Sequence, residues 1–317
     1  MPPSLPFTVA ICTWNRSELL YRTLERLISV RWPASAAELI IVDNGSTDDT
    51  RAVAEEFSAR LPQRVVHEAT PGLSSARNRA LAEATTSHVL FTDDDVLVED
   101  GWLPAFAEAA ARYPEATVFG GPIEPWFPET PDPELVAAFP ALGGGFCGLD
   151  HHRSVGPLPA PLDVFGANMA FRRDALGDLR FDPRLGPTRG RAITSEETLL
   201  IDRLRARGGD VVWVPAMRLR HFVAPERMTL AYLMRYYHDL ARGETRRRGR
   251  PAGARVLGVP QWVLRQVVEA RLRNYWHRVR GHHQAALVAL RQYQYYSGMA
   301  VECFALHREK SATTTGT

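Results

Sequence analysis

The sequence has few cysteines and no long apolar run, and each absence narrows the class of protein. Its three cysteines, Cys12, Cys147 and Cys303, are far apart and lack metal-site spacing, so we expect reduced thiols and no disulfide framework. The N-terminus lacks the basic and apolar segments of a signal peptide, and no stretch of about 18 consecutive apolar residues occurs. A cytoplasmic protein without a membrane-spanning helix is therefore expected.

Two sequence signatures of other functional classes are also missing. No Gly-x-Gly-x-x-Gly fingerprint follows the first predicted strand, which argues against a dinucleotide-dependent oxidoreductase. An Arg-rich segment spans residues 246–250, but no recognised nucleic-acid module accompanies it. The chain does have 317 residues, of which 45% are hydrophobic and 23% charged, enough to bury a large core.

Charge is distributed unevenly along the chain. Residues 218–317 hold 18 Lys and Arg against 6 Asp and Glu, whereas residues 1–217 hold 20 against 30. The body is thus acidic, at about −10, and the tail basic, at about +12. Such a tail suggests contact with an anionic partner, namely a membrane surface, a phosphorylated acceptor or nucleic acid, although a solvated helical face explains it equally well.

Hydrophobic patterning predicts alternating strands and helices, which is typical of a mostly parallel sheet covered on both faces. Ligands of such sheets bind beyond the carboxyl ends of the strands, where this chain has three polar clusters, at residues 13–16, 43–46 and 93–95. We expect strands at 7–12, 38–42, 65–67, 88–91 and 211–214, and helices at 17–30, 50–59, 73–84 and 195–207.

Two segments interrupt this pattern. Residues 120–161 are rich in Gly and Pro and predict a long irregular excursion, which in compact domains is usually a functional loop. Regular structure is expected to return near residues 163–172. Beyond Pro225 the pattern is helical, with an expected break at residues 242–258. We therefore divide the chain into a catalytic domain, 1–222, and a basic helical region, 223–317.

Asp93, Asp94 and Asp95 are the clearest chemical signal. Three adjacent carboxylates at a strand end repel one another unless a cation neutralises them, and hard oxygen ligands suit Mg²⁺ or Mn²⁺. A charged turn that caps the next helix is the alternative explanation of the triplet alone. The surrounding sequence favours the metal.

Six segments, in this order, resemble family 2 glycosyltransferases over about residues 7–222: 7–16, 40–48, 72–80, 91–95, 165–173 and 195–200. The resemblance implies the GT-A fold, an α/β fold, and transfer of a sugar from a nucleoside diphosphate sugar, UDP being the commonest nucleotide, with inversion at the anomeric carbon. It also implies a set of nucleotide-sugar contacts, namely Thr13, Asn15 and Arg16 in the nucleotide pocket, Asp43 at the base, Arg77 at the nucleotide or its phosphates, Asp93 and Asp94 in the acidic motif, and Asn168 near the donor sugar and the acceptor.

The resemblance further implies a metal site and a base. Asp95 is expected to bind Mn²⁺ or Mg²⁺ directly, Asp93 to touch the ribose or the metal shell, and His221, just past a strand, to complete that shell. The family usually has a Glu-Asp pair that opens a helix and supplies the general base, where this chain has Glu196 and Glu197. Glu197 occupies the Asp position, so Glu196 stays an alternative base or an acceptor anchor.

Several aromatic residues have two possible roles. Trp102 and Trp126 are candidates for stacking on a sugar, but they pack into a core equally well. The tail has a predicted helical stripe interleaved with arginines. Its apolar residues are Trp262, Val263, Val267, Val268 and Leu272, and the arginines are Arg265, Arg271, Arg273, Arg278 and Arg280. That stripe either rests on an anionic membrane, at its inner face, or docks on the catalytic domain or a second copy. The acceptor is expected to be a glycan, lipid-linked or other hydroxyl.

A non-catalytic protein of the same fold, which binds a nucleotide sugar or acts as a scaffold, is the main alternative. The departure at Glu197 is the feature that favours it. Retention of the Asp triplet and of His221 favours an enzyme.

Overall fold

The computed structural model describes residues 6–34, 36–130, 133, 142–188, 191–193 and 195–314. The chain forms two compact units. Unit 1 comprises Met1–Trp126, Cys147–Arg189 and Glu196–Phe222, and unit 2 comprises Phe127–Phe146, Gly190–Ser195 and Val223–Thr317. Two short segments before residue 222 thus group with the C-terminal helices, and the division into domains at residue 222 stays a prediction.

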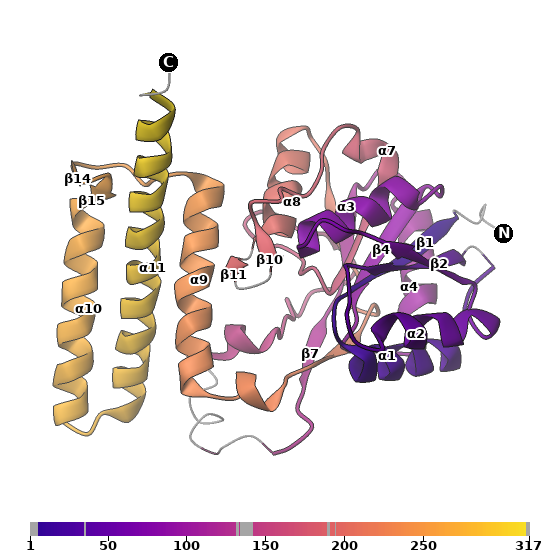
Figure 1. The fold of residues 1–317 in the computed structure, drawn as a ribbon, viewed down its shortest axis with the longest axis horizontal. Coiled ribbons are helices and arrows are strands. Elements are labelled where there is room, and N and C mark those ends of the chain that lie inside the picture. Colours follow the sequence, from indigo (N-terminus) through magenta and orange to yellow (C-terminus); the bar gives the residue numbers. More distant parts are fainter. Residues whose placement is uncertain are drawn as a thin grey trace. The chain divides into compact units, whose positions relative to one another are not determined.

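An eight-stranded sheet forms the centre of unit 1 (Figure 1). Strands β1 to β4 are mutually parallel where they pair, and β9 runs antiparallel between β4 and β6. This confirms the mostly parallel α/β sheet that the sequence predicts. In spatial order the strands are β3 (Gln63–His67), β2 (Ala36–Asp43), β1 (Phe7–Thr13), β4 (His88–Asp93), β9 (Asn168–Arg172), β6 (Val118–Gly120), β12 (Val211–Trp213) and β8 (Gly156–Pro157).

Helices cover both faces of this sheet (Figure 1). Alternate residues of β1 point to opposite faces, so Val9 joins a core with Leu24, while Ala10 joins a separate core with Ala80 and Ile201. The first face carries α1 (Ser17–Ser29), α2 (Thr50–Glu56) with a 3-10 turn at Phe57–Ala59, and α4 (Trp102–Arg112), and the second carries α3 (Leu73–Glu83) and α8 (Glu196–Ala206). A further short helix, α7, spans Arg173–Leu176.

A second, three-stranded sheet was not predicted from the sequence. In it β13 (Leu219–Phe222) lies between β5 (Val96–Val98) and β7 (Ile123–Trp126), antiparallel to β5 and parallel to β7. Its strands have only three or four residues, too few for a period-of-two pattern to stand out. This small sheet brings residues 219–222 beside the acidic triplet.

Two expectations concern irregular segments, and only the second needs correction. The segment 120–161 contains β7, a 3-10 turn at Gly143–Phe146 and β8 among its described residues, while 131–132 and 134–141 lie outside them. The expected break at 242–258 begins only after residue 248, because Arg242–Arg248 continue helix α9 (Leu230–Arg248). Arginine is a good helix former, so the Arg-rich composition does not end the helix, and Gly249, with φ +80°, does.

Unit 2 contains three long helices, α9, α10 (Gln261–Val279) and α11 (His283–Thr314), with a β14 and β15 hairpin (Arg255–Val256, Val259–Pro260) before α10. Helix α11 packs against both α9 and α10 (Figure 1). At Gly298 a Cβ atom would lie 2.0 Å from the carbonyl oxygen of His238, so glycine permits the close approach of α9 and α11. The fully buried Glu302 of α11 forms ion pairs with Arg242 and Arg246 of α9.

None of the helices in the described residues is long and apolar enough to cross a membrane.

Candidate active site

The three polar clusters predicted at strand ends meet at the carboxyl edge of the sheet. Strands β1, β2 and β4 are adjacent and parallel, so Thr13, Asp43 and Asp93 end neighbouring strands. The hydroxyl of Thr13 donates a 2.7 Å hydrogen bond to Asp94, and Thr47 N donates a 2.7 Å bond to Oδ1 of Asn15. These contacts define one site from segments far apart in sequence.

Asp93, Asp95 and His221 form a compact ligand cluster within this site. One ligand atom from each residue lies within 4.8 Å of the others. His221 is not just past a strand as expected but inside β13, opposite Val96, which places its ring beside Asp95. Its Nε2 lies 3.3 Å from Oδ1 of Asp95 and 3.5 Å from Oδ2 of Asp93.

The chemistry of this cluster fits a divalent cation. Oδ1 of the buried Asp95 has no hydrogen-bond partner among the described residues, and a buried carboxylate oxygen is stabilised by a cation. Nδ1 of His221 is 2.9 Å from the carbonyl oxygen of Phe222 and donates to it, so Nε2 faces the carboxylates and, once it has lost its proton, offers its lone pair to a cation bound between them. Two carboxylates and one imidazole suit Mn²⁺ or Mg²⁺, Mn²⁺ accepting imidazole more readily.

Without a cation the same cluster attracts protons. Burial lowers the pKa of His221, but the carboxylates of Asp95 and Asp93 outweigh it and raise the pKa to about 10. Burial raises the pKa of Asp93, but His221 and Arg77 outweigh it and lower the pKa to about 2. Without a bound metal ion, the protonated ring of His221 is therefore the cation that compensates the negative charge of the aspartates beside it.

Asp94 points to a different set of partners from its two neighbours. Its carboxylate accepts the Thr13 hydroxyl and a 3.0 Å hydrogen bond from Arg16, whose Nη1 also lies 2.6 Å from Oδ2 of Asp95. Thr13 and Asp94 are buried, whereas about a third of the Arg16 side chain is exposed. Thr13 and Asp94 thus hold the ends of β1 and β4 together, and Arg16 faces the acidic cluster.

Asn15 and Asp43 shape the loops beside the cluster. Asn15 has φ +49°, a left-handed conformation that asparagine tolerates, and its backbone N–H donates a 3.0 Å hydrogen bond to the Ser46 hydroxyl. The buried Asp43 accepts the Ser46 N–H at 2.9 Å through Oδ1. Asp43 is thereby fixed at the end of β2, and it stays a predicted contact of the base.

Trp14 is a residue that sequence reasoning left without a role. It follows β1 directly, between Thr13 and Asn15, and 42% of it is exposed. An exposed indole beside the loop that holds Asn15 is a candidate surface for stacking of a planar ring. Its position between two predicted contacts is the sequence signal that could have found it.

Arg77 and Glu196 form a buried ion pair next to the cluster. The Arg77 guanidinium donates a 2.8 Å hydrogen bond to Oε1 of Glu196 and lies 3.5 Å from Oδ1 of Asp93, and it also stacks near the Phe181 ring. Burial and the adjacent Glu197 raise the pKa of Glu196 to about 8, against the opposing effect of Arg77. Arg77 therefore links the acidic motif to the start of α8.

Glu197, the other candidate base, is only partly buried. Its Oε2 has no hydrogen-bond partner among the described residues, and neither has Oε2 of Glu196, but the other oxygen of Glu196 is held by Arg77. The ion pair with Arg77 is therefore what distinguishes the two carboxylates. The two neighbours thus differ in a way that their sequence alone does not reveal.

Asn168 has no exposed surface, which favours a structural role. Its Oδ1 accepts the indole N–H of Trp102 at 2.9 Å, and its Nδ2 donates to the carbonyls of Pro122 and Met217. Trp102 is fully buried, so the suggestion that it stacks on a sugar is wrong. Trp126 is partly buried against Phe222, with ring centroids 5.3 Å apart.

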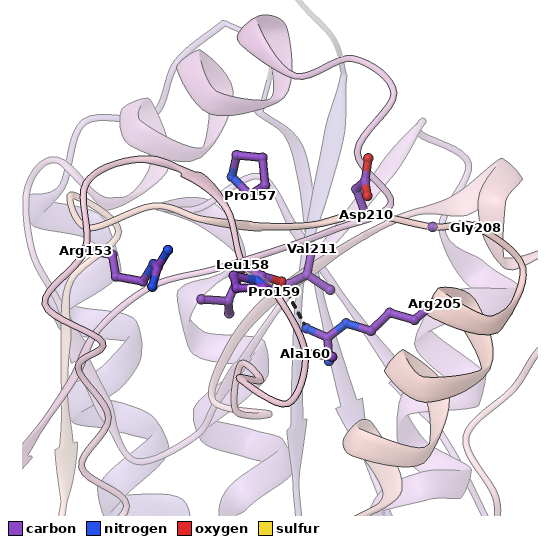
Figure 2. Close-up of a pocket in the computed structure, with 10 residues that line it drawn as sticks. Arg153, Pro157, Leu158, Pro159, Ala160, Arg205, Gly208, Asp210 and Val211 are labelled. Carbon is purple, nitrogen blue, oxygen red and sulfur yellow. Dashed lines mark hydrogen bonds between the residues drawn. The ribbon is translucent and has the colours of Figure 1, made fainter.

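A separate concavity of about 510 Å³ contains none of the predicted site residues (Figure 2). It lies at the amino end of β12, whereas the acidic cluster is at the carboxyl ends of the strands. Arg205, a partly buried cation that lines the concavity, already binds Asp163 and the carbonyls of Leu158 and Leu162. Arg205 thus holds the loop of residues 158–163 in place, and few of its N–H groups remain to bind a ligand.

The strands and helices adopt the GT-A fold of glycosyltransferases, and this fold carries the acidic site. Residues 8–144 match the description "Glycosyl transferase family 2". The chain is 36% identical, over 89 residues, to "Uncharacterized glycosyltransferase YibD" of Escherichia coli, a match that covers 28% of this chain and 25% of YibD. Matches to eight curated relatives cover between 15% and 35% of the length of each relative.

Two solved structures share the fold. The mannosyltransferase PcManGT from Pyrobaculum calidifontis, in complex with GDP-Man and Mn²⁺, aligns with a TM-score of 0.55 and 17% identity, covering 99% of this chain and 80% of PcManGT. S. aureus TarS 1-349 in complex with UDP-GlcNAc aligns with a TM-score of 0.55 and 15% identity, covering 96% of this chain and 92% of TarS 1-349. At these identities the likeness establishes the fold alone.

Proposed function

We propose that this chain transfers a sugar from a nucleoside diphosphate sugar to a hydroxyl acceptor, with inversion at the anomeric carbon. The observation that carries the proposal is the cluster of Asp93, Asp95 and His221 with the Glu196 and Glu197 carboxylates nearby in a family 2 domain. One part of such a site binds a cation and the other accepts a proton. Inverting transfer needs both functions.

Asp93, Asp95 and His221 are the residues that would hold Mn²⁺ or Mg²⁺. When bound, the ion neutralises negative charge that develops on the departing diphosphate. Arg16 and Arg77, which already lie against the acidic motif, place two further positive charges beside it. Arg77 stays a predicted contact of the nucleotide or its phosphates.

The donor site is proposed to lie over the ends of β1 and β2. Asp43 accepts a hydrogen bond from the base, Trp14 stacks on it, and Asn15 keeps the loop in place through Thr47. UDP is the favoured nucleotide, in keeping with the UDP-GlcNAc bound to TarS, although PcManGT binds GDP-Man. The sugar carried by the donor is open.

Glu197 is proposed as the general base. Its free oxygen takes the proton of the acceptor hydroxyl, the acceptor oxygen bonds to the anomeric carbon from the face opposite the diphosphate, and the bond to the diphosphate breaks. The products are the glycosylated acceptor and a nucleoside diphosphate. Glu196, held by Arg77, is proposed to position this helix start. The acceptor is a hydroxyl of a glycan, a lipid-linked sugar or another small molecule.

A thermal-shift screen of UDP, GDP and their sugars, each with and without Mn²⁺, tests the donor half of the proposal. We expect a rise in melting temperature that needs both the nucleotide and the ion. Release of nucleoside diphosphate, through slow donor hydrolysis, then distinguishes a transferase from a binding protein of the same fold. Metal-dependent binding with no turnover against any acceptor panel favours the non-catalytic alternative.

A further inference from the structure

Helix α10 exposes a continuous apolar stripe. The residues of this "α10 stripe" are Leu264, Val268, Leu272, Tyr275 and Val279, with exposed fractions of 38%, 58%, 62%, 70% and 70%. They are separated by four, four, three and four positions. At about 100° per residue they cover one side of the helix over roughly 80°.

The opposite side of α10 is already packed. Val263, Ala270 and Asn274 are buried, and Asn274 Nδ2 donates a 2.7 Å hydrogen bond to the Ala286 carbonyl of α11. The prediction that Val263 belongs to the exposed stripe is therefore wrong, because Val263 lies on the packed side of the helix. Helix α10 lies beside α11 and packs against it through this face (Figure 1). The stripe is on the other side of α10 and is exposed. Single apolar residues are common on protein surfaces, but five large ones on the same helix face form a contiguous apolar patch, which is typical of an interaction surface.

Arginines border the stripe on both sides. Helical geometry places Arg271 and Arg278 along one edge and Arg265 along the other. Arg273 and Arg280 lie further round, and Glu269 is the only acidic residue between 261 and 280. Trp276 adds a half-exposed indole near the Arg265 edge, with the Arg280 guanidinium 4.1 Å from its ring centroid.

We propose that the α10 stripe lies flat on the surface of an anionic lipid bilayer. Apolar side chains in the centre would enter the boundary between head groups and acyl chains, and the flanking arginines would contact anionic head groups. Tryptophan and tyrosine beside an apolar face are typical of this interface. The proposal concerns unit 2 alone and stands without the proposed transferase activity.

Charge argues against a second copy of the stripe as its occupant. Two α10 helices packed through this face would bring Arg265, Arg271 and Arg278 of one copy against the same residues of the other. With one glutamate per helix there is too little negative charge to compensate. An anionic surface complements the pattern, and a self-interface does not.

Co-sedimentation of the full-length protein with vesicles tests the proposal. We expect binding to vesicles of phosphatidylcholine with about one-third phosphatidylglycerol at low salt, and at least about tenfold weaker binding to pure phosphatidylcholine. Equal binding to both, or no binding to the anionic vesicles, overturns it.

Two matched pairs of variants locate the surface. Val268→Glu with Leu272→Glu adds repulsion at exposed positions and should reduce vesicle binding at least about tenfold. Val301→Glu with Phe304→Glu changes two exposed apolar residues of α11 and should leave it unchanged. Arg271→Gln and Arg278→Gln should each weaken binding about fivefold, whereas Arg22→Gln with Arg51→Gln, on exposed helix surfaces of unit 1, should not.

The outcomes remain interpretable if a variant is damaged. Nucleoside diphosphate binding and melting temperature, measured on the same samples, report folding of unit 1 and of the whole chain. A light-scattering mass that doubles in the wild type and reverts in the Val268→Glu, Leu272→Glu variant would identify a self-interface and overturn the lipid assignment. Equal loss of vesicle binding in the α11 pair would overturn the assignment to α10.

Discussion

The guanidinium of Arg77 donates a 2.8 Å hydrogen bond to Oε1 of Glu196, a residue 119 positions later in the chain. Both side chains are almost completely buried, with 3% and 5% of their surface exposed. The pair joins α3 to α8 and, through the 3.5 Å contact between Arg77 and Asp93, joins both helices to the acidic motif. The position of the predicted base is thus coupled to the position of the predicted metal ligands.

Removal of Arg77 should destabilise the fold through the charge that it leaves behind. At pH 9, where Glu196 is ionised, we expect Arg77→Met to lower the free energy of unfolding by about 3–5 kcal/mol, the range for one broken partner of a buried pair. Glu196→Gln in the Arg77→Met background should recover part of this loss. Urea unfolding of the two single variants and the double variant measures the coupling. Simple additivity of the two changes would contradict the pairing.

The pKa of Glu196 predicts how stability depends on pH. Its pKa is about 8 in the folded chain against an ordinary value of 4.5, so the folded state binds its proton more tightly than the unfolded state. That contribution is fully present below about pH 4.5 and is lost as pH rises through about 8. In EDTA, Glu196→Gln should therefore lose less melting temperature than the wild type between pH 5 and 9. Parallel curves for the two proteins would refute this.

The sequence was sufficient to predict five strands of the main sheet, β1 to β4 and β12, and the polar clusters at the ends of three of them. Apolar runs such as Phe7–Thr13 and His88–Asp93 are long enough to be recognised, and polar clusters directly after them predict a site at one edge. The resemblance to a known family then assigned roles to individual residues. Those roles were assigned from the order of the six motifs along the chain, and that order can be read from a single sequence.

Side-chain partners were beyond sequence reasoning. Whether Asn168 faces a ligand or the core depends on Trp102, Pro122 and Met217, which lie 46 to 66 positions away. The short strands β5 and β13 have no strong pattern of their own, so the pairing that places His221 opposite Val96 was equally hidden. Packing at long range decides these details, and local periodicity does not report it.

The two neighbouring glutamates should respond differently to removal of charge. We expect Glu197→Gln to leave donor binding nearly unchanged and to lower transfer by about 10²-fold or more, as for loss of a general base. Glu196→Gln, which keeps a hydrogen-bond acceptor for Arg77, should lower transfer less. Single-turnover transfer and nucleotide titration measure the two effects separately. If Glu196→Gln shows the larger loss, the base is one residue earlier than proposed.

Asp95→Ala should abolish the part of nucleotide binding that depends on a metal. The substitution removes a buried carboxylate without removing apolar packing, so the chain should remain folded. Thermal shifts with nucleoside diphosphate and Mn²⁺ measure the loss, and Asp100→Ala, at a largely exposed carboxylate, serves as the control. Undiminished Mn²⁺-dependent stabilisation in Asp95→Ala would remove Asp95 from the metal site.

Asn168→Ala should affect stability and leave the donor contacts intact. The amide satisfies the indole N–H of Trp102 and the carbonyls of Pro122 and Met217, so its removal leaves three buried polar groups without their partner. Each such group costs about 1–3 kcal/mol, and because the site relaxes in part we expect a total loss of about 3 kcal/mol in urea unfolding. The Kd for nucleoside diphosphate sugar is then measured at a temperature where the variant is folded. We expect it to stay within about threefold of the wild-type value, because loss of a donor contact worth about 1.4 kcal/mol of binding free energy would raise the Kd tenfold. An unchanged unfolding free energy with a tenfold weaker Kd would return Asn168 to the donor site.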